Sequence, residues 1–192
     1  TGNIDKATAE EQVSVKAGET VEIDLVIASG FVVPAAVYAE GGPDVEDDGI
    51  RFEVRAVKAD IKGNRETLAG QYGSGGGMDV PPGDYVLHAR LGEAEAEAPI
   101  TVKAGERTEA TVNIDAGVLA ISAPGARRID IYSAKKDIQG NQKGFGGAYD
   151  ETMQETLPPG EYEVRVLYEG DKGDKSQKAT VTAGERAEVT VE

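Results

Sequence analysis

The sequence repeats itself at long range, and this repetition constrains the fold more than any other feature. Asp60–Asn64 (DIKGN) recurs as Asp137–Asn141 (DIQGN), and Pro81–Tyr85 (PPGDY) recurs as Pro158–Tyr162 (PPGEY), each at an offset of 77 positions. A period of this length is too long for one unit of a solenoid and suits a small β-sandwich. The repeats therefore predict two tandem modules.

A third motif, Ala-Gly-Glu, occurs three times, with its glycines at Gly18, Gly105 and Gly184. Apolar and polar residues alternate on both sides of each glycine. This pattern is typical of two half-buried strands joined by a tight turn in which glycine adopts a positive φ. We expect each copy to form a β-hairpin.

These motifs divide the chain into three expected parts. Residues 1–27 form a leading hairpin from a preceding repeat, residues 28–115 a first β-sandwich, and residues 116–192 a second. The first module also contains an acidic insertion at 40–49 that has no counterpart in the second. Because an isolated hairpin is marginal in water, we expect residues 13–27 either to join the first module's sheet or to pair with another molecule.

The expected fold class is all-β, with two tandem immunoglobulin-like or prealbumin-like sandwiches. Only 5% of residues are aromatic, so the core must consist mainly of Val, Ile, Leu and Ala. The stretch 93–98 favours a helix by composition, but its counterpart in the second module is rich in Gly, so we expect a hairpin and a strand in both modules. Further strands are expected at 31–39, 50–58, 118–123 and 128–134.

Alternation after each Pro-Pro-Gly turn predicts which side chains enter the core. Tyr85 and Tyr162 are expected to be buried, whereas His88 and Arg165 are expected to be exposed on the opposite face.

Two runs in the second module resemble known β-sandwich families. Leu157–Val166 (LPPGEYEVRV), followed by Val181–Glu185 (VTAGE), is similar to the C-terminal half of carboxypeptidase-regulatory-like, collagen-adhesin B-type and PEGA-type domains. With Ala134–Asn141 (AKKDIQGN), the chain more closely resembles tandem repeats found downstream of a von Willebrand factor A domain in bacterial secreted or membrane-anchored proteins. The resemblance implies an extracytoplasmic accessory array. The A domain's metal motif (D-x-S-x-S) is absent from this chain, so its metal chemistry does not transfer.

The net charge of −15 excludes several classes of partner. Nucleic acids and anionic membranes are bound through Lys and Arg, so neither is expected, and no stretch approaches the roughly 20 apolar residues that cross a bilayer. We expect a protein partner or adjacent domains of the same chain, possible self-association through residues 13–27, no membrane insertion and no cofactor. The expected location is periplasmic, cell-surface or secreted, with the export signal outside the given sequence.

Few residues could carry chemistry. His88 is the one histidine and could serve a Ser-His-Asp triad, but no nucleophile motif accompanies it, so an enzyme is not expected. The weak calcium candidates are four carboxylates in the acidic insertion, which are hard oxygen ligands without EF-hand spacing: Asp44, Glu46, Asp47 and Asp48. Asp60 and Asp137 could also supply oxygen ligands, but a turn in which Asp accepts backbone N–H groups is favoured.

The leading functional hypothesis is a non-catalytic structural or interaction module that spaces or presents an adhesion-type von Willebrand factor A domain outside the cytoplasm. The alternative is a glycan- or peptide-binding accessory module that uses the insertion at 40–49. The chain has no Trp, so a sugar-stacking surface would be poorly supplied.

Overall fold

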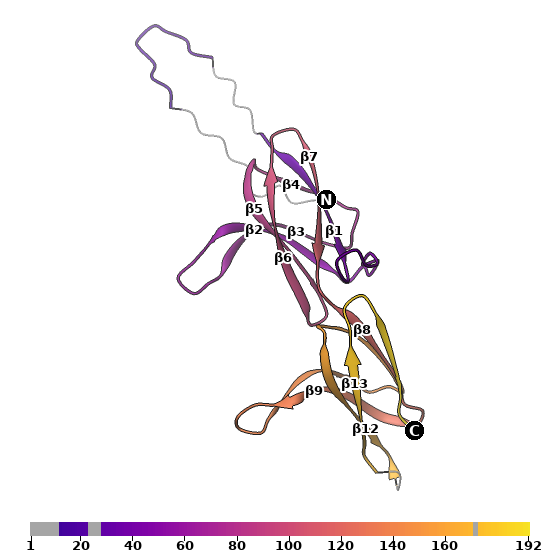
Figure 1. Cartoon of the computed structure of the whole chain (residues 1–192). Coiled ribbons are helices and arrows are strands. Elements are labelled where there is room, and N and C mark those ends of the chain that lie inside the picture. Colours follow the sequence, from indigo (N-terminus) through magenta and orange to yellow (C-terminus); the bar gives the residue numbers. More distant parts are fainter. Residues whose placement is uncertain (1–11, 23–27, 171–172) are drawn as a thin grey trace.

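The computed structural model describes residues 12–22, 28–170 and 173–192. Figure 1 shows two bodies joined end to end, both made of strands. The described residues form four sheets and no α-helix. Residues 94–98 lie in a strand and do not form the helix that composition alone would favour. The fold class predicted from the sequence, two tandem β-sandwiches, is confirmed.

The first sandwich packs a three-stranded sheet against a four-stranded sheet. The strand order is β4-β1-β7 in one and β3-β2-β5-β6 in the other, and the β1–β7 pair is parallel. The strand bounds are β1 (Gly30–Val37), β2 (Arg51–Ala59), β3 (Arg65–Tyr72), β4 (Met78–Val80), β5 (Gly83–Leu91), β6 (Ala94–Val102) and β7 (Arg107–Asn113).

The second sandwich repeats this topology strand for strand. Its sheets have the orders β11-β8-β14 and β10-β9-β12-β13, and the β8–β14 pair is again parallel. The strand bounds are β8 (Gly117–Ser122), β9 (Ala126–Lys136), β10 (Gln142–Ala148), β11 (Thr152–Leu157), β12 (Gly160–Tyr168), β13 (Lys175–Val181) and β14 (Arg186–Thr190). The repeat in the sequence is therefore a repeat in topology.

The Ala-Gly-Glu segments are not hairpins in either sandwich, and that prediction is wrong. β6 and β7 lie in different sheets, as do β13 and β14, so the turns at Gly105 and Gly184 are arches that carry the chain from one sheet to the other. Alternation cannot distinguish the two cases because both direct apolar side chains into the same core. Gly18 lies at the third copy of the turn, in residues 12–22, which belong to no described strand; residues 23–27 lie outside the described residues.

The core placements predicted around the Pro-Pro-Gly turns are partly right. Tyr162 is buried, with 4% of its surface exposed, whereas Tyr85 is only half-buried. Phe145 packs edge-on against Tyr162, with ring centroids 5.1 Å apart, and the corresponding position in the first sandwich is the smaller Leu68. Leu68 offers no second ring to cover Tyr85.

His88 is buried, with 5% of its surface exposed, so the prediction that it is exposed is wrong. It points away from the core as alternation requires, since its neighbours Leu87 and Ala89 lie in the core cluster. Long charged side chains of the adjacent strands cover this outer face. Its counterpart Arg165 is half-exposed.

We predict that Tyr162→Ala lowers the free energy of unfolding by about 3 kcal/mol, as for other large-to-small core substitutions. Tyr162→Phe keeps the ring and loses only the hydrogen bond that the hydroxyl donates to the Pro158 carbonyl at 2.7 Å. It should therefore cost about 1 kcal/mol. Urea unfolding measures both, and Tyr85→Ala is the matched control at the half-buried position. Equal losses for Tyr85→Ala and Tyr162→Ala would contradict the difference in packing.

Candidate functional site

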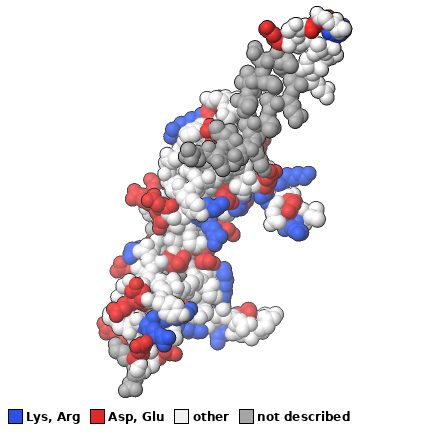
Figure 2. All heavy atoms as spheres, turned by 180° about the vertical axis from the view of Figure 1, so that it is seen from behind, with Lys and Arg blue, Asp and Glu red and all other residues white. Residues whose placement is uncertain are grey.

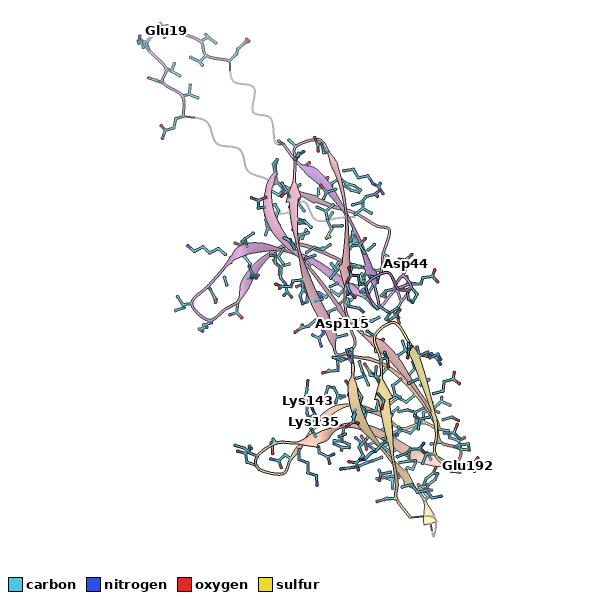
Figure 3. All side chains as sticks on the ribbon, in the orientation of Figure 1. Glu19, Asp44, Asp115, Lys135, Lys143 and Glu192 are labelled. Carbon is cyan, nitrogen blue, oxygen red and sulfur yellow. The ribbon has the colours of Figure 1, made fainter. Side chains whose placement is uncertain are left out.

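The link between the two sandwiches is short and buried. β7 ends at Asn113 and β8 begins at Gly117, and between them Ile114 and Ala116 are 2% and 0% exposed. The Ile114 N–H donates to the Val37 carbonyl at 3.0 Å, and the Ala116 N–H donates to the Tyr38 carbonyl at 2.8 Å. Figure 3 shows Asp115 at this junction. The link is thus part of the first sandwich's hydrogen-bonded structure and not a free tether.

The arch of the second sandwich sits against the first sandwich on one side of this link. The Gly184 N–H donates to the Ala116 carbonyl at 2.8 Å. A Cβ at Gly184 would lie 3.0 Å from the Ala39 Cβ and 3.9 Å from the Pro43 Cδ. Only glycine gives this close approach, and its φ of +76° also favours glycine.

A second contact is made by the turn between β5 and β6. The Glu93 N–H donates to the Thr156 carbonyl at 3.2 Å, and the Glu93 carboxylate lies 3.5 Å from the Lys143 ammonium. A Cβ at Gly92 would lie 2.7 Å from that same carbonyl oxygen and 2.5 Å from a carboxylate oxygen of Glu155. Each sandwich therefore inserts a glycine turn against the other, and we call these contacts with the link the joint.

Burial perturbs the titratable groups of the joint. Burial raises the pKa of Tyr38, whose side chain hydrogen-bonds to Thr156. Burial also raises the pKa of Glu155, and the charge of Glu93 raises it further. These shifts have the direction expected where packing excludes water. Sequence reasoning did not predict the joint; its one signal was that the two expected modules, 28–115 and 116–192, follow each other without a linker.

A shallow basin of about 490 Å³ lies on the outer face of the sheet β3-β2-β5-β6. Glu53 lines the basin and accepts hydrogen bonds from Arg51 (2.7 Å) and Arg55 (2.6 Å). Arg51 also donates to the Tyr72 hydroxyl at 3.1 Å and lies over that ring. The guanidinium groups of both arginines are thus directed to partners within the protein.

His88 adjoins this charged cluster. Its Nε2 lies 3.4 Å from a Glu95 carboxylate oxygen, and its Nδ1 is buried without a hydrogen-bond partner among the described residues. The nearby carboxylate of Glu53 is ion-paired, and no Ser, Thr or Cys lines the basin. The residues described here provide no nucleophile for His88 to activate.

The second sandwich repeats the same cluster. Arg128 donates to Asp130 at 2.8 Å and lies over the Tyr149 ring at 4.7 Å, and the offset of 77 maps these residues onto Arg51, Glu53 and Tyr72. Because both repeats have this cluster, we interpret it as a structural element that covers the outer face of each four-stranded sheet. Sequence reasoning missed it, although the Arg-x-acid pattern at 51–53 and 128–130 was a signal.

The structure does not bring the calcium candidates together. Asp44, Glu46, Asp47 and Asp48 are all exposed, and Asp47 accepts the Gly49 N–H at 2.7 Å. Within the described ranges, no three His, Cys, Asp or Glu side chains form a group that could hold a metal ion.

Asp60 and Asp137 form the capped turns that the sequence favoured. The Asp60 carboxylate accepts the backbone N–H groups of Lys62 and Asn64, both at 2.8 Å. Asp137 accepts the equivalent pair at 2.9 and 2.7 Å. These backbone hydrogen bonds hold the pKa of both carboxyls below the usual range.

In the described part of the chain, no helix has the length and apolar character needed to cross a membrane.

A scan against protein-family models finds no match, and a search of curated proteins finds none. The chain is similar to solved structures. The Bacillus anthracis TIE protein is 17% identical, with a TM-score of 0.36, and the match covers 95% of this chain and 37% of that protein. An adhesin-like protein from Bacteroides ovatus is 8% identical, with a TM-score of 0.40 and coverages of 78% and 75%. The shaft pilin SpaA from Lactobacillus rhamnosus GG, a mutant form, is 9% identical, with a TM-score of 0.37 and coverages of 85% and 98%.

We predict that Glu53 stabilises the first sandwich in a pH-dependent way. Burial alone would raise its pKa, but the hydrogen bonds from Arg55 and Arg51 outweigh burial and hold the pKa below its usual value. A lowered folded-state pKa stabilises the protein above the unfolded-state pKa of about 4.3, and this contribution is lost as the pH falls through the folded-state value. Glu53→Gln should therefore cost about 2 kcal/mol at neutral pH and progressively less below about pH 4.

Urea unfolding across this pH range measures the effect. Glu109→Gln is the control, because Glu109 pairs with Arg107 while its side chain is 75% exposed, and it should change stability little at any pH. A Glu53→Gln deficit that stays constant with pH would contradict the assignment.

Proposed function

We propose that this chain is a non-catalytic spacer within an extracytoplasmic bacterial protein, in which two β-sandwiches hold neighbouring domains at a fixed separation. The single observation that carries the proposal is the buried link, with Ile114 and Ala116 almost fully enclosed and hydrogen-bonded on both sides. A tether that only connects domains needs no such burial. An adhesion-type von Willebrand factor A domain, suggested by the sequence resemblance, is the proposed neighbour.

The joint supports a rigid spacer for a second reason. It contains two separate glycine contacts, at Gly92 and Gly184, and an ion pair between Glu93 and Lys143. Two separate contacts beside a link restrict bending more than a single contact, which would leave a hinge.

We predict a single narrow distance distribution between nitroxide labels at Thr111→Cys and Gln177→Cys, measured by pulsed electron paramagnetic resonance. Both positions are exposed, one in each sandwich, and the chain has no Cys of its own. Gly184→Asn should broaden the distribution and cost about 1 kcal/mol more than the control, because its side chain meets Ala39 across the joint.

Gly105→Asn is the matched control for this experiment. Gly105 and Gly184 have φ values of +71° and +76°, so both substitutions impose the same local strain, but a Cβ at Gly105 meets nothing within 4 Å. A broad distribution in the unsubstituted chain would overturn the spacer proposal.

We also propose the division at residues 28 and 116, with residues 1–27 belonging to a preceding repeat. Val13 and Val15 are 41% and 62% exposed, whereas their counterparts Ile100 and Val102 are 8% and 2% exposed. The turn itself is formed in the leading copy, since the Glu19 N–H donates to the Lys16 carbonyl at 3.0 Å. These observations support an arch whose own sandwich is missing from the described residues.

We predict that deleting residues 1–27 leaves the urea midpoint of the remaining chain unchanged and abolishes any self-association seen by analytical ultracentrifugation. The reason is that exposed Val13 and Val15 contribute nothing to the first sandwich's core. A large drop in midpoint would instead show that this segment belongs to the first sandwich.

The alternative is a glycan- or peptide-binding module that uses the insertion at 40–49, whose carboxylates are exposed. At the basin around Glu53, a ligand would compete with the internal partners of Arg51 and Arg55. For this reason we place the spacer first.

A further inference from the structure

Two isoleucine side chains are exposed to solvent at the tips of long hairpins. Ile61, between β2 and β3, is 103% exposed, and Ile138, between β9 and β10, is 98% exposed. They occupy the same position in the two repeats. Figure 1 shows both hairpins projecting to the same side of the molecule. A fully exposed Ile has no role in the core, so its recurrence needs another explanation.

Both tips have the same hydrogen-bonded backbone. Asp60 and Asp137 each accept two backbone N–H groups across the turn, and Gly63 and Gly140 have φ values of +86° and +87°. The side chain of Ile61 or Ile138 therefore protrudes from a preorganised turn and not from a loose loop.

The tips extend well beyond the sheets. β2 pairs with β5 only as far as Ala56, five residues before Ile61, and β9 pairs with β12 as far as Ser133, five residues before Ile138. At about 3.3 Å per extended residue, each tip lies up to about 16 Å past the last residue paired with the neighbouring strand. This is about twice the Debye length at physiological ionic strength, so most of the chain's negative charge is screened at the tips.

The charge next to each tip has the opposite sign to that of the chain. At the first tip Lys58 and Lys62 outnumber Asp60, and at the second Lys135 and Lys136 outnumber Asp137, so two lysines minus one aspartate leave each tip at +1, whereas the net charge of the chain is −15. Figure 2 shows side chains of both signs on the first hairpin, and Figure 3 places Lys135 on the second. An anionic target is therefore complementary to the tips themselves. The expectation that no anionic membrane is bound came from the net charge of the whole chain, which does not describe the local charge at the tips.

The lysines agree in number between the two tips but not in position. Lys58 corresponds to Lys135, but Lys62 corresponds to Gln139 and Lys136 corresponds to Ala59. A binding site on a protein requires charged side chains at fixed positions. Lipid headgroups form a laterally fluid layer, so the lysines need only carry the opposite charge and lie close to the phosphates. An apolar tip flanked by lysines also matches the interface between headgroups and acyl chains.

We infer that the two hairpin tips form a peripheral contact surface for an anionic lipid layer, with Ile61 and Ile138 entering the interface and the lysines lying among the phosphates. This contact rests on the rigid joint of the proposed function, because both tips must face the same side to reach one surface. The label-to-label distance tests the joint, and vesicle binding tests the tips, so the two failures can be told apart. Two weak contacts on one chain reinforce each other when they engage together.

Fluorescence tests the inference directly, because the chain has no Trp. Ile61→Trp and Ile138→Trp each place a single reporter at a tip, and Thr111→Trp places one on the exposed side of β7 as the control. With vesicles of phosphatidylcholine mixed with phosphatidylglycerol, both tip reporters should shift to shorter wavelength and the control should not. Vesicles of phosphatidylcholine alone should give a smaller shift.

Flotation of the unsubstituted chain with vesicles provides the second measurement. The double variant Ile61→Ser/Ile138→Ser should reduce the bound fraction by about fivefold while keeping the urea midpoint, because both side chains are exposed. Equal binding of this variant would mean contact through charge alone and would overturn the inference. So would the absence of a shift on any vesicle, which a binding site on a protein predicts, or a concentration-dependent shift without vesicles, which self-association predicts.

Discussion

The passage of the chain from one sheet to the other at Gly105 and Gly184 is the constraint on which the rest of the structure depends. The crossing sends β7 and β14 to the facing sheet, where each pairs in parallel with the first strand of its own sandwich. It thereby closes the core between the two sheets. At Gly184 the same turn also contacts the first sandwich, so one glycine turn both closes a module and attaches it to its neighbour.

The fold class could be predicted from the sequence because the repeat and the alternation are independent signals that agree. The repeat also corrected the local preference of residues 93–98 for a helix, since those residues lie in β6. The pairing partners of β6 and β7 could not be predicted, because period-two alternation reports which face of a strand is buried and not which strand lies beside it. The joint was missed for a related reason: contacts between modules leave no periodic pattern.

His88 shows a different limit of sequence reasoning. Alternation placed its side chain on the outer face of β5, which is right, and equated that face with solvent, which is wrong. The arginines and glutamates of adjacent strands lie along the sheet and cover what lies beneath them, as long charged side chains commonly do. Glu53 is only 9% exposed for the same reason, and its charge is compensated by Arg51 and Arg55. A polar outer face can therefore be substantially closed to water.

The direction of the two hairpin tips follows from the joint. Each tip is held by its own Asp turn, but whether Ile61 and Ile138 face one side depends on the rotation between the sandwiches. That rotation is set by the contacts of Gly92 and Gly184 and by the buried link through Ile114 and Ala116. If the link were free, two identical tips would sample unrelated directions and rarely reach one surface together. A rigid joint holds the two repeated tips on the same side of the molecule, so that both can reach one surface.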